Sequence, residues 1–334
     1  MKTYFFLLLA ICFGTSSIAQ YAPQMGVPGS TAISASSSLF TGWATQCTIA
    51  RGYLNIDTPT LGVTTSGDSS LAIGVPDMAV VSLGDSGVAT LTFSSPIYDG
   101  PGADFAVFEN GFPNPVNDSQ AFLELAFVEV SSDGSRYVRF PAISLTPLET
   151  QIPAAGVYMY ANLLNNLAGK YIGRYGTPFD LQELTDSPGI DISNITHVRI
   201  VDVIGTIGDH ASHDITGRII NDPFPTQFAT GGFDLDAVGA IHQIDHTSVQ
   251  AIGNNISVNT YPNPATDKLI VSVNGTVPNK LDVILTTITG KELERYTLSQ
   301  HINEIPVAQL PAGMYYLVLL DANGNKWVEK VTKR

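Results

Sequence analysis

Two segments of the chain combine acidic and amide side chains in a way that suits a bound cation. The first is DGPGADFAVFEN at 99–110, which ends on Glu109 and Asn110, and the second is GGFDLDAV at 231–238. Calcium takes about six to eight oxygen ligands from carboxylates, amides and backbone carbonyls. Asp234 and Asp236 lie two residues apart and therefore share one face of a strand. If the two segments are neighbouring strands, they predict a structural calcium bound by Glu109, Asn110, Asp234 and Asp236.

The same acids have other uses that the sequence leaves open. They can cap turns, or they can pair with Arg136, Arg139 or Arg199. Asp202 shares a predicted strand face with apolar residues and so points inward, where an unpaired carboxylate is costly. Two roles remain for it: a hydrogen bond to a loop, which is favoured, and a further cation ligand.

A second group of candidate ligands is the segment DHASHD at 209–214, which holds two histidines and two acids. Zinc sites often use such pairs, but His210 and His213 lack further ligands and a helical frame. A solvated loop is therefore the favoured interpretation. The surrounding loop, residues 205–230, is long and contains glycine and proline, which predicts the rim of a binding surface.

Residues for catalysis do not assemble into a recognisable set. The chain has no Gly-x-Ser-x-Gly motif, and nothing in the sequence pairs Glu124, Glu129 or Glu183 as an acid and a base. Cys47, the only cysteine beyond the N-terminal apolar segment, has no visible group to lower its pKa and is interpreted as a small buried apolar residue. No catalytic residue and no organic cofactor are predicted, and an enzyme is the less favoured function.

Short alternating or apolar segments predict the strands that must position these residues. They are 88–93, 103–110, 122–130, 136–141, 198–204 and 233–241. The Asp133-Gly134 pair predicts a hairpin turn. Only two short helices are expected, one within 160–169 and one that starts at Thr177 with Pro178 in its first turn. The predicted fold is all-β, a jelly-roll-like β-sandwich followed by a small immunoglobulin-like β-sandwich.

The chain divides into segments of different character. Residues 1–19 combine one lysine, an apolar run and a small-residue exit, which is typical of a secretory signal peptide. Residues 20–244 are predicted to form the first sandwich, 245–256 a polar linker and 257–334 the second sandwich. Residues 20–256 hold 23 Asp and Glu against 7 Lys and Arg, a net charge of −16, whereas 257–334 hold 7 against 8. This difference indicates two modules.

Charge and hydropathy exclude several classes of partner. The acidic first module repels nucleic acid phosphates and anionic membrane surfaces. After the N-terminal segment, no run approaches the roughly 20 apolar residues that cross a bilayer. A transmembrane segment and a nucleic-acid partner are therefore not predicted.

The last segment carries four motifs in a fixed order: YPNPATDKLIVSV at 261–273, TGK at 289–291, LPAGMYYLVL at 310–319 and KVTK at 330–333. In these motifs it resembles the C-terminal sorting domain of the type IX (Por) secretion system, in its type A form. The resemblance implies delivery across the outer membrane by the type IX machinery, usually with removal of residues 257–334. The protein outside the cell is then expected to begin near Gln20 and to end within 243–258.

The first module resembles an uncharacterised family of bacterial cell-surface proteins with a GPGxDFxVFEN motif. The shared text is VSLGDSG at 81–87, DGPGADFAVFEN at 99–110, FVEVSSDG at 127–134 and GGFDLDAV at 231–238. The resemblance to this family does not imply an activity. The FDLDAV strand is also similar to the last strand of jelly-roll carbohydrate-binding and discoidin-like modules, and in the carbohydrate-binding modules an acid there often holds a structural calcium.

Together these observations predict a secreted or cell-surface protein whose first module is a non-catalytic binding or adhesion domain for a glycan or another surface ligand. Two alternatives stay open, a secreted glycan-active hydrolase and a purely structural surface component. Two carboxylates about 5–10 Å apart in an open cleft favour the hydrolase. An aromatic-lined groove with few acids favours binding.

Overall fold

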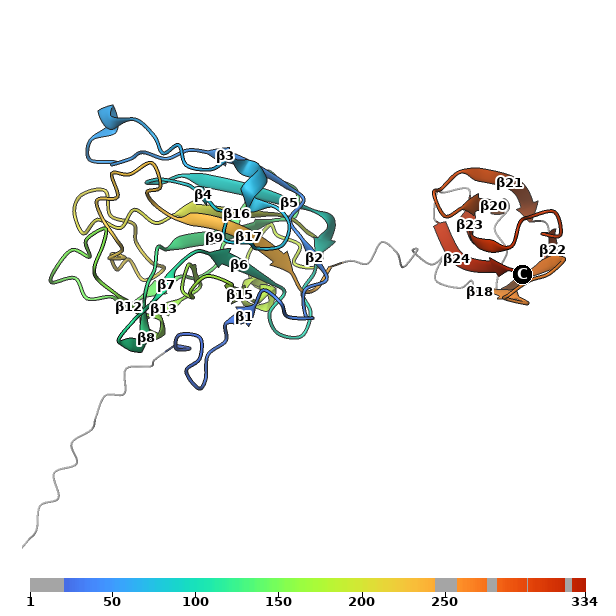
Figure 1. Cartoon of the computed structure of the whole chain (residues 1–334), viewed down its shortest axis with the longest axis horizontal. Helices are drawn as coiled ribbons and strands as arrows, with labels where there is room; N and C mark the ends of the chain where they lie inside the picture. The colour runs from blue at the N-terminus through green and yellow to red at the C-terminus, as the bar shows by residue number, and fades with distance from the viewer. Residues whose placement is uncertain (1–20, 244–256, 275–280, 299, 322–325) are drawn as a thin grey trace, which may run out of the picture. The chain divides into compact units, whose positions relative to one another are not determined.

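The structure is a computed structural model that describes residues 21–243, 257–274, 281–298, 300–321 and 326–334 (Figure 1). The chain forms two compact units, Met1–Ile244 and Asp245–Arg334. Among the described residues the regular elements are β-strands and 3-10 helices of three or four residues. The prediction of an all-β protein is therefore confirmed.

The first large sheet of the first unit is centred on β6 and β17. It has the order β1-β15-β6-β17-β2, with β4 pairing with β17 as well, and all its pairs are antiparallel. Its strands are β1 (Ile33–Ser34), β2 (Gly42–Trp43), β4 (Val81–Ser82), β6 (Phe105–Glu109), β15 (Tyr175–Phe179) and β17 (Asp234–Ala240).

The second large sheet is centred on β16. It has the order β10-β9-β16-β5-β3, with β14 pairing with β9. Its strands are β3 (Gln46–Ala50), β5 (Val88–Ile97), β9 (Ala126–Ser131), β10 (Val138–Arg139), β14 (Leu167–Ala168) and β16 (Ile195–Asp202).

The two large sheets share one hydrophobic core. It combines Phe105 and Leu235 of the first sheet with Leu91, Val128 and Val198 of the second. Every residue of β6 and β17 is buried, because the outer face of the first sheet is covered as well. There, Phe108 packs against Phe40 and Trp43, with ring centroids 5.6 and 5.5 Å apart. The two faces of β6 are divided as its alternating pattern predicts.

Smaller sheets extend the first unit at the end where β7, β8 and β12 are labelled in Figure 1. One has the order β12-β8-β7, and the other pairs β11 with β13. These strands are β7 (Phe112–Asn114), β8 (Asn117–Phe122), β11 (Ile143–Ser144), β12 (Met159–Tyr160) and β13 (Leu164–Asn165). The 3-10 helices are η1 (Pro59–Leu61), η2 (Ser69–Ala72), η3 (Ala161–Leu163) and η4 (Leu181–Leu184).

The second unit is a small sandwich of two antiparallel sheets. The sheets have the orders β18-β19-β22 and β21-β20-β23-β24, and they share a core that includes Leu269, Val283 and Leu317. The strands are β18 (Ser257–Tyr261), β19 (Lys268–Asn274), β20 (Leu281–Thr287), β21 (Glu292–Leu298), β22 (Ile302–Pro306), β23 (Gly313–Asp321) and β24 (Lys326–Lys333).

Each of the two predicted helices is present only as a short 3-10 helix, η3 within 160–169 and η4 within 177–184. Residues 175–179 form β15, which pairs with β6, so Thr177 is in a strand rather than at a helix cap. The short helix η4 begins later, where the Asp180 carboxylate accepts a hydrogen bond from the Gln182 amide at 3.0 Å. Residues 160–169 form short strands around η3. In both places sheet pairing overrides the local helix signals.

The predicted strand over 122–130 is interrupted. β8 ends at Phe122 and β9 begins at Ala126. Between them, the amide of Leu125 donates to Oδ2 of Asp222 at 3.0 Å, and its carbonyl accepts from the amide of Val203 at 3.0 Å. The Leu125 amide thus bonds to a side chain and not to a neighbouring strand, where β8 and β9 are separated. Glu124 lies in this interval and lines a pocket.

Candidate functional site

A pocket of about 230 Å³, here called the acidic pocket, opens between the first sheet and the loop that follows β16. The acidic pocket is lined by residues from the segments after β6 and β8, from the start of β17 and from the loop over 205–230. Its lining residues are Asn110, Phe112, Phe122, Glu124, Ala154, Thr226, Phe228, Thr230 and Asp234. The predicted rim at 205–230 therefore contributes side chains to this pocket.

Asp234 is the fixed acid of the pocket. Its Oδ1 accepts a hydrogen bond from the Ser82 hydroxyl at 2.5 Å, and its Oδ2 accepts one from Nδ2 of Asn110 at 3.0 Å. Burial raises the pKa of Asp234, while these two hydrogen bonds lower it and only partly compensate. The donors hold the carboxylate in one orientation at the edge of the pocket.

Glu124 is the unsatisfied acid of the pocket. Its residue is 8% exposed, and none of the described residues donates a hydrogen bond to its carboxylate. Burial raises the pKa of Glu124 well above its usual value, and the negative charges of Asp234 and Glu109 raise it further. An ionised carboxylate in this position needs a partner from outside the protein.

Two deeper carboxylates add to the negative charge behind the pocket. Oε2 of Glu109 accepts from the Gly111 amide at 2.8 Å, and Oδ2 of Asp222 accepts from Leu125. Their other oxygens, Oε1 of Glu109 and Oδ1 of Asp222, are buried without a partner in the described part of the chain. Burial is the main reason why the pKa of each lies well above its usual value.

Aromatic rings form the outer wall of the pocket. Phe112 and Phe228 are 50% and 56% exposed, which is high for phenylalanine. Phe112 stacks on Phe122 with ring centroids 5.0 Å apart, and Tyr158 meets Phe112 edge-on at 6.2 Å. The pocket thus combines rigid apolar faces with hydrogen-bonding groups at its base.

The four residues predicted to bind calcium fall into two groups. Glu109 lies opposite Leu235 in the antiparallel β6–β17 pair, and Asn110 contacts Asp234, so these three gather at one end of the pair. The Asp236 carboxylate instead accepts from the amides of Asp77 and Met78, both at 3.1 Å, beside a register shift between Leu235 and Ala237. Burial raises the pKa of Asp236 to about 6. Calcium at these residues stays a prediction.

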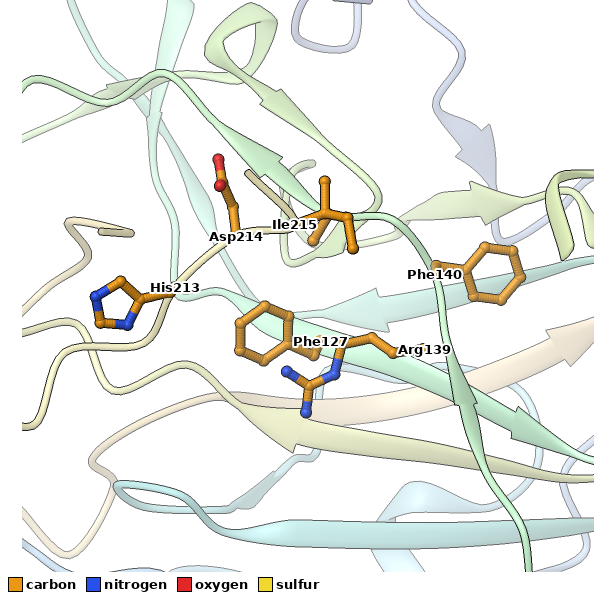
Figure 2. Close-up of a pocket in the computed structure, with 7 residues that line it drawn as sticks. Phe127, Arg139, Phe140, His213, Asp214 and Ile215 are labelled. Atoms are coloured by element: carbon orange, nitrogen blue, oxygen red, sulfur yellow. The ribbon is translucent and has the colours of Figure 1, made fainter. Parts of the chain in front are cut away.

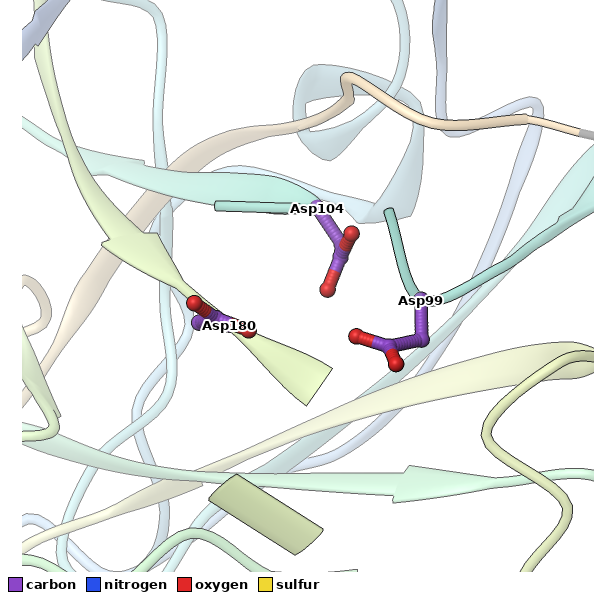
Figure 3. Close-up of side chains that lie close together, drawn as sticks. All are labelled: Asp99, Asp104 and Asp180. Carbon is purple, nitrogen blue, oxygen red and sulfur yellow. The ribbon is translucent and has the colours of Figure 1, made fainter. Parts of the chain in front are cut away.

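A separate group of acids lies at the other end of β6. Asp99, Asp104 and Asp180 each place a carboxylate oxygen within 4.8 Å of the others, and Figure 3 shows the three side chains pointing toward a common centre. Both oxygens of Asp104 are already used: they accept from the amides of Gly100 and Leu181, and one contacts Nδ1 of His242 at 2.7 Å. Oδ1 of Asp99, by contrast, is buried without a partner in the described part of the chain. This group joins the Gly-Pro-Gly corner to β15 and to the end of β17.

Asp202 has the role that was favoured for it. Its Oδ1 accepts from the Phe233 amide at 2.7 Å and its Oδ2 from the Ser86 amide at 3.0 Å. The prediction of a hydrogen bond to a loop is confirmed. Cys47 is half-buried, and burial raises the pKa of its thiol to about 11, so it is not an activated nucleophile.

The histidines of the 209–214 segment do not converge. Nδ1 of His210 contacts Oδ1 of Asp57 at 2.7 Å, whereas His213 lines a separate pocket of about 180 Å³ beside Phe127 and Arg139. Figure 2 shows the Asp214 carboxylate pointing away from the His213 ring. Asp214 accepts from the amides of Ser144, Thr216 and Arg218 and so anchors its own loop.

Comparison with known proteins identifies the second unit. Residues 259–334 match the family model of the secretion system C-terminal sorting domain. The type IX resemblance of this segment is therefore confirmed, and the protein is exported to the cell surface or the extracellular space. Among the described residues, no helix is long and apolar enough to span a membrane.

The chain also resembles solved structures at low sequence identity. A biofilm-associated protein BSP domain is 8% identical with a TM-score of 0.21, and the match covers 74% of this chain and 48% of that one. A β-glucuronidase from Ruminococcus gnavus in complex with D-glucaro-d-lactam is 12% identical with a TM-score of 0.20, covering 75% and 37%. The chain thus spans less than half of either protein. No curated protein matches the sequence.

Proposed function

We propose that residues 20–244 form a non-catalytic binding or adhesion module that recognises a glycan or another surface ligand at the acidic pocket. The sorting domain at 259–334 supports the location of this module outside the cell, where such ligands occur. The sorting domain implies contact with the type IX machinery. Its removal after export is part of the proposal.

The observation that carries the proposal is the pairing of exposed rings with polar groups in one pocket. Phe112 and Phe228 offer flat apolar faces, on which sugar rings stack. Asn110 and Asp234 lie beside them and supply amide and carboxylate groups that bond sugar hydroxyls. A small number of fixed polar groups within an apolar wall is typical of a ligand pocket.

A glycan-active hydrolase is the second candidate. One observation favours it: Glu124, whose pKa is raised well above its usual value, shares the pocket with Asp234. A protonated acid beside a second carboxylate is the pair that glycosidases use. A purely structural surface component is the third alternative, and it needs no ligand at this pocket.

A glycan array probed with purified residues 20–334 tests the proposal. Binding of one glycan class is expected, and Phe228→Ala should weaken it by about tenfold because a stacking face is lost. Leu61→Ala is the matched control, since Leu61 is 48% exposed and lies in η1, away from the pocket lining. No binding to any glycan, or equal binding by both variants, would contradict the proposal.

The same protein distinguishes the hydrolase. The glycan that binds is incubated with the protein, and newly formed reducing ends are measured over time. Binding without new reducing ends supports the binding module. Reducing ends that disappear in Asp234→Asn would establish the hydrolase instead.

A further inference from the structure

The acidic pocket has more carboxyl groups in and near its wall than basic side chains to pair with them. Glu124 and Asp234 line it, and Glu109 and Asp222 lie behind it. None of its lining residues is Lys, Arg or His. Each of these four acids is buried, and an unpaired ion in such a place costs several kcal/mol. The charge therefore calls for a cation or a proton.

Four basic residues elsewhere in the first unit are already engaged. Arg139 and Arg199 both pair with Glu129, and Arg218 donates to the carbonyls of Ser144 and Thr146. Lys170 donates from Nζ to the carbonyl of Leu164 at 2.8 Å. The missing positive charge is thus not supplied by these side chains.

The most specific observation is the carboxylate of Glu124. It is nine-tenths buried, it lines the pocket, and no described residue donates to it. By contrast, both oxygens of Asp234 are bonded, and one oxygen of Glu109 and of Asp222 is bonded. A group left open only toward a pocket marks the position of a ligand atom that donates hydrogen bonds.

The size and walls of the pocket favour an organic cation over a metal ion. A volume of about 230 Å³ exceeds what a single ion fills and fits one sugar ring. Among the described residues, the carboxylates close enough together to share a metal ion are those of Asp99, Asp104 and Asp180, whose oxygens lie within 4.8 Å of one another. None of these three residues lines the acidic pocket. Phe112, Phe122 and Phe228 line the wall, and aromatic faces attract an ammonium group through their negative face potential.

We propose that the acidic pocket binds an amino sugar, whose protonated amine pairs with Glu124 and whose ring lies against the exposed faces of Phe112 and Phe228. This inference rests on the proposed glycan-binding function and names the class of glycan. The amine donates hydrogen bonds to Oε1 or Oε2 of Glu124, and Asp234 stabilises its charge from the side. Asn110 stays bound to Asp234 and keeps that carboxylate in place.

The test compares two ligands that differ only at the amine. Binding of a β-1,4-linked glucosamine tetrasaccharide and of its fully N-acetylated counterpart is measured by titration calorimetry at pH 7 with residues 20–334. The free amine should bind about tenfold more tightly, since a charge-assisted pair at a desolvated site is stronger than a neutral hydrogen bond. High salt should reduce this difference.

Glu124→Gln removes the charge and keeps the shape. It should lower affinity for the glucosamine ligand about tenfold and leave the N-acetylated ligand little changed. Asp209→Asn is the matched control, because it removes the same charge from an exposed loop position outside the pocket. The melting midpoint of each variant shows whether it is folded.

The outcomes separate this inference from the proposed function. Equal affinity for the two ligands, unchanged in Glu124→Gln, overturns the amino-sugar inference and leaves glycan binding in place. Binding of calcium chloride alone that depends on Glu124, with no binding of either sugar, overturns both and assigns the pocket to a metal. No binding of any of the three probes overturns the amino-sugar inference, and the glycan array then decides the proposed function.

Discussion

Nδ2 of Asn110 lies 3.0 Å from Oδ2 of Asp234, to which it donates a hydrogen bond between the end of β6 and the start of β17. The two residues are 124 positions apart. They close one side of the acidic pocket and set the orientation of its fixed carboxylate. The stretch at 99–110 therefore contributes to the acidic pocket through Asn110, which positions an acid.

Asn110→Ala should destabilise the first unit. The substitution leaves Oδ2 of Asp234 without its donor in a buried position, which costs about 1–3 kcal/mol. A melting midpoint lower by several degrees is expected. Asn194→Ala is the control, since no hydrogen bond of its side chain is recorded in the described region. A melting midpoint equal to that of the control would show that the Asn110–Asp234 hydrogen bond does not contribute to the stability of the folded state.

Glu124→Gln should stabilise the ligand-free protein, most of all at alkaline pH. The pKa of Glu124 is raised in the folded state, so the folded protein holds a proton that the unfolded chain has lost above pH 4.5. The wild type therefore loses stability as pH rises from about 4.5 toward the raised pKa. The variant lacks this loss and should gain about 1–3 kcal/mol at pH 8.

Melting curves at pH 5 and pH 8 check this expectation. The other acids that face Glu124 are Glu109 on β6, Asp202 on β16, Asp222 in the following loop and Asp234 on β17. Burial raises the pKa of each of them, so the wild type should be more stable at pH 5 than at pH 8. The variant should show a smaller difference. A melting midpoint that depends more steeply on pH in Glu124→Gln than in the wild type would contradict the explanation that the raised pKa of Glu124 destabilises the folded state at high pH.

Chelation tests the calcium prediction for Glu109, Asn110, Asp234 and Asp236. A bound calcium stabilises the folded state by mass action, so a chelator should lower the melting midpoint and excess calcium should restore it. Magnesium is the control, because it demands a tighter octahedral geometry and should restore less. A melting midpoint that is unchanged by the chelator would contradict the prediction of a structural calcium.

Deletion of residues 257–334 should abolish export, because the sorting domain lies there. Fractionation of expressing cells is expected to find the deleted protein inside the outer membrane and the full chain at the surface or in the medium. Intact-mass measurement of the exported form should show an end within 243–258. Phe228→Ala serves as the control and should be exported normally. Exported protein that keeps Arg334 would contradict removal of the domain.

The pairing of β6 with β17 was accessible from the sequence as a hypothesis, because β6 ends on an acid and β17 has two acids near its start. Their register, Leu235 opposite Glu109, brings together three of the four residues singled out as ligands. Asp236 was harder to place, because its partners, the amides of Asp77 and Met78, lie about 160 residues away. Backbone amides carry no signal in a sequence.

Glu124 was missed for a different reason. It is one of two acids, with Glu129, in the otherwise apolar run at 122–130, and such a run is typical of a strand covered on both sides. The break between β8 and β9 involves Asp222, which lies 97 residues beyond Leu125 and accepts a hydrogen bond from the Leu125 amide. An acid inside a run of buried apolar residues was the available signal. The role of Phe228 was less visible still, since loop aromatics follow no period.

The position of β17 has a consequence for how the chain reaches its folded form. β17 is the last strand of the first unit, yet it lies between β6 on one side and β2 and β4 on the other. Until residues 234–240 have been synthesised, these three strands keep unpaired edges, which invite contacts with other chains. Such non-local closure also slows folding. The first sheet is therefore complete only once the last strand of the unit has joined it.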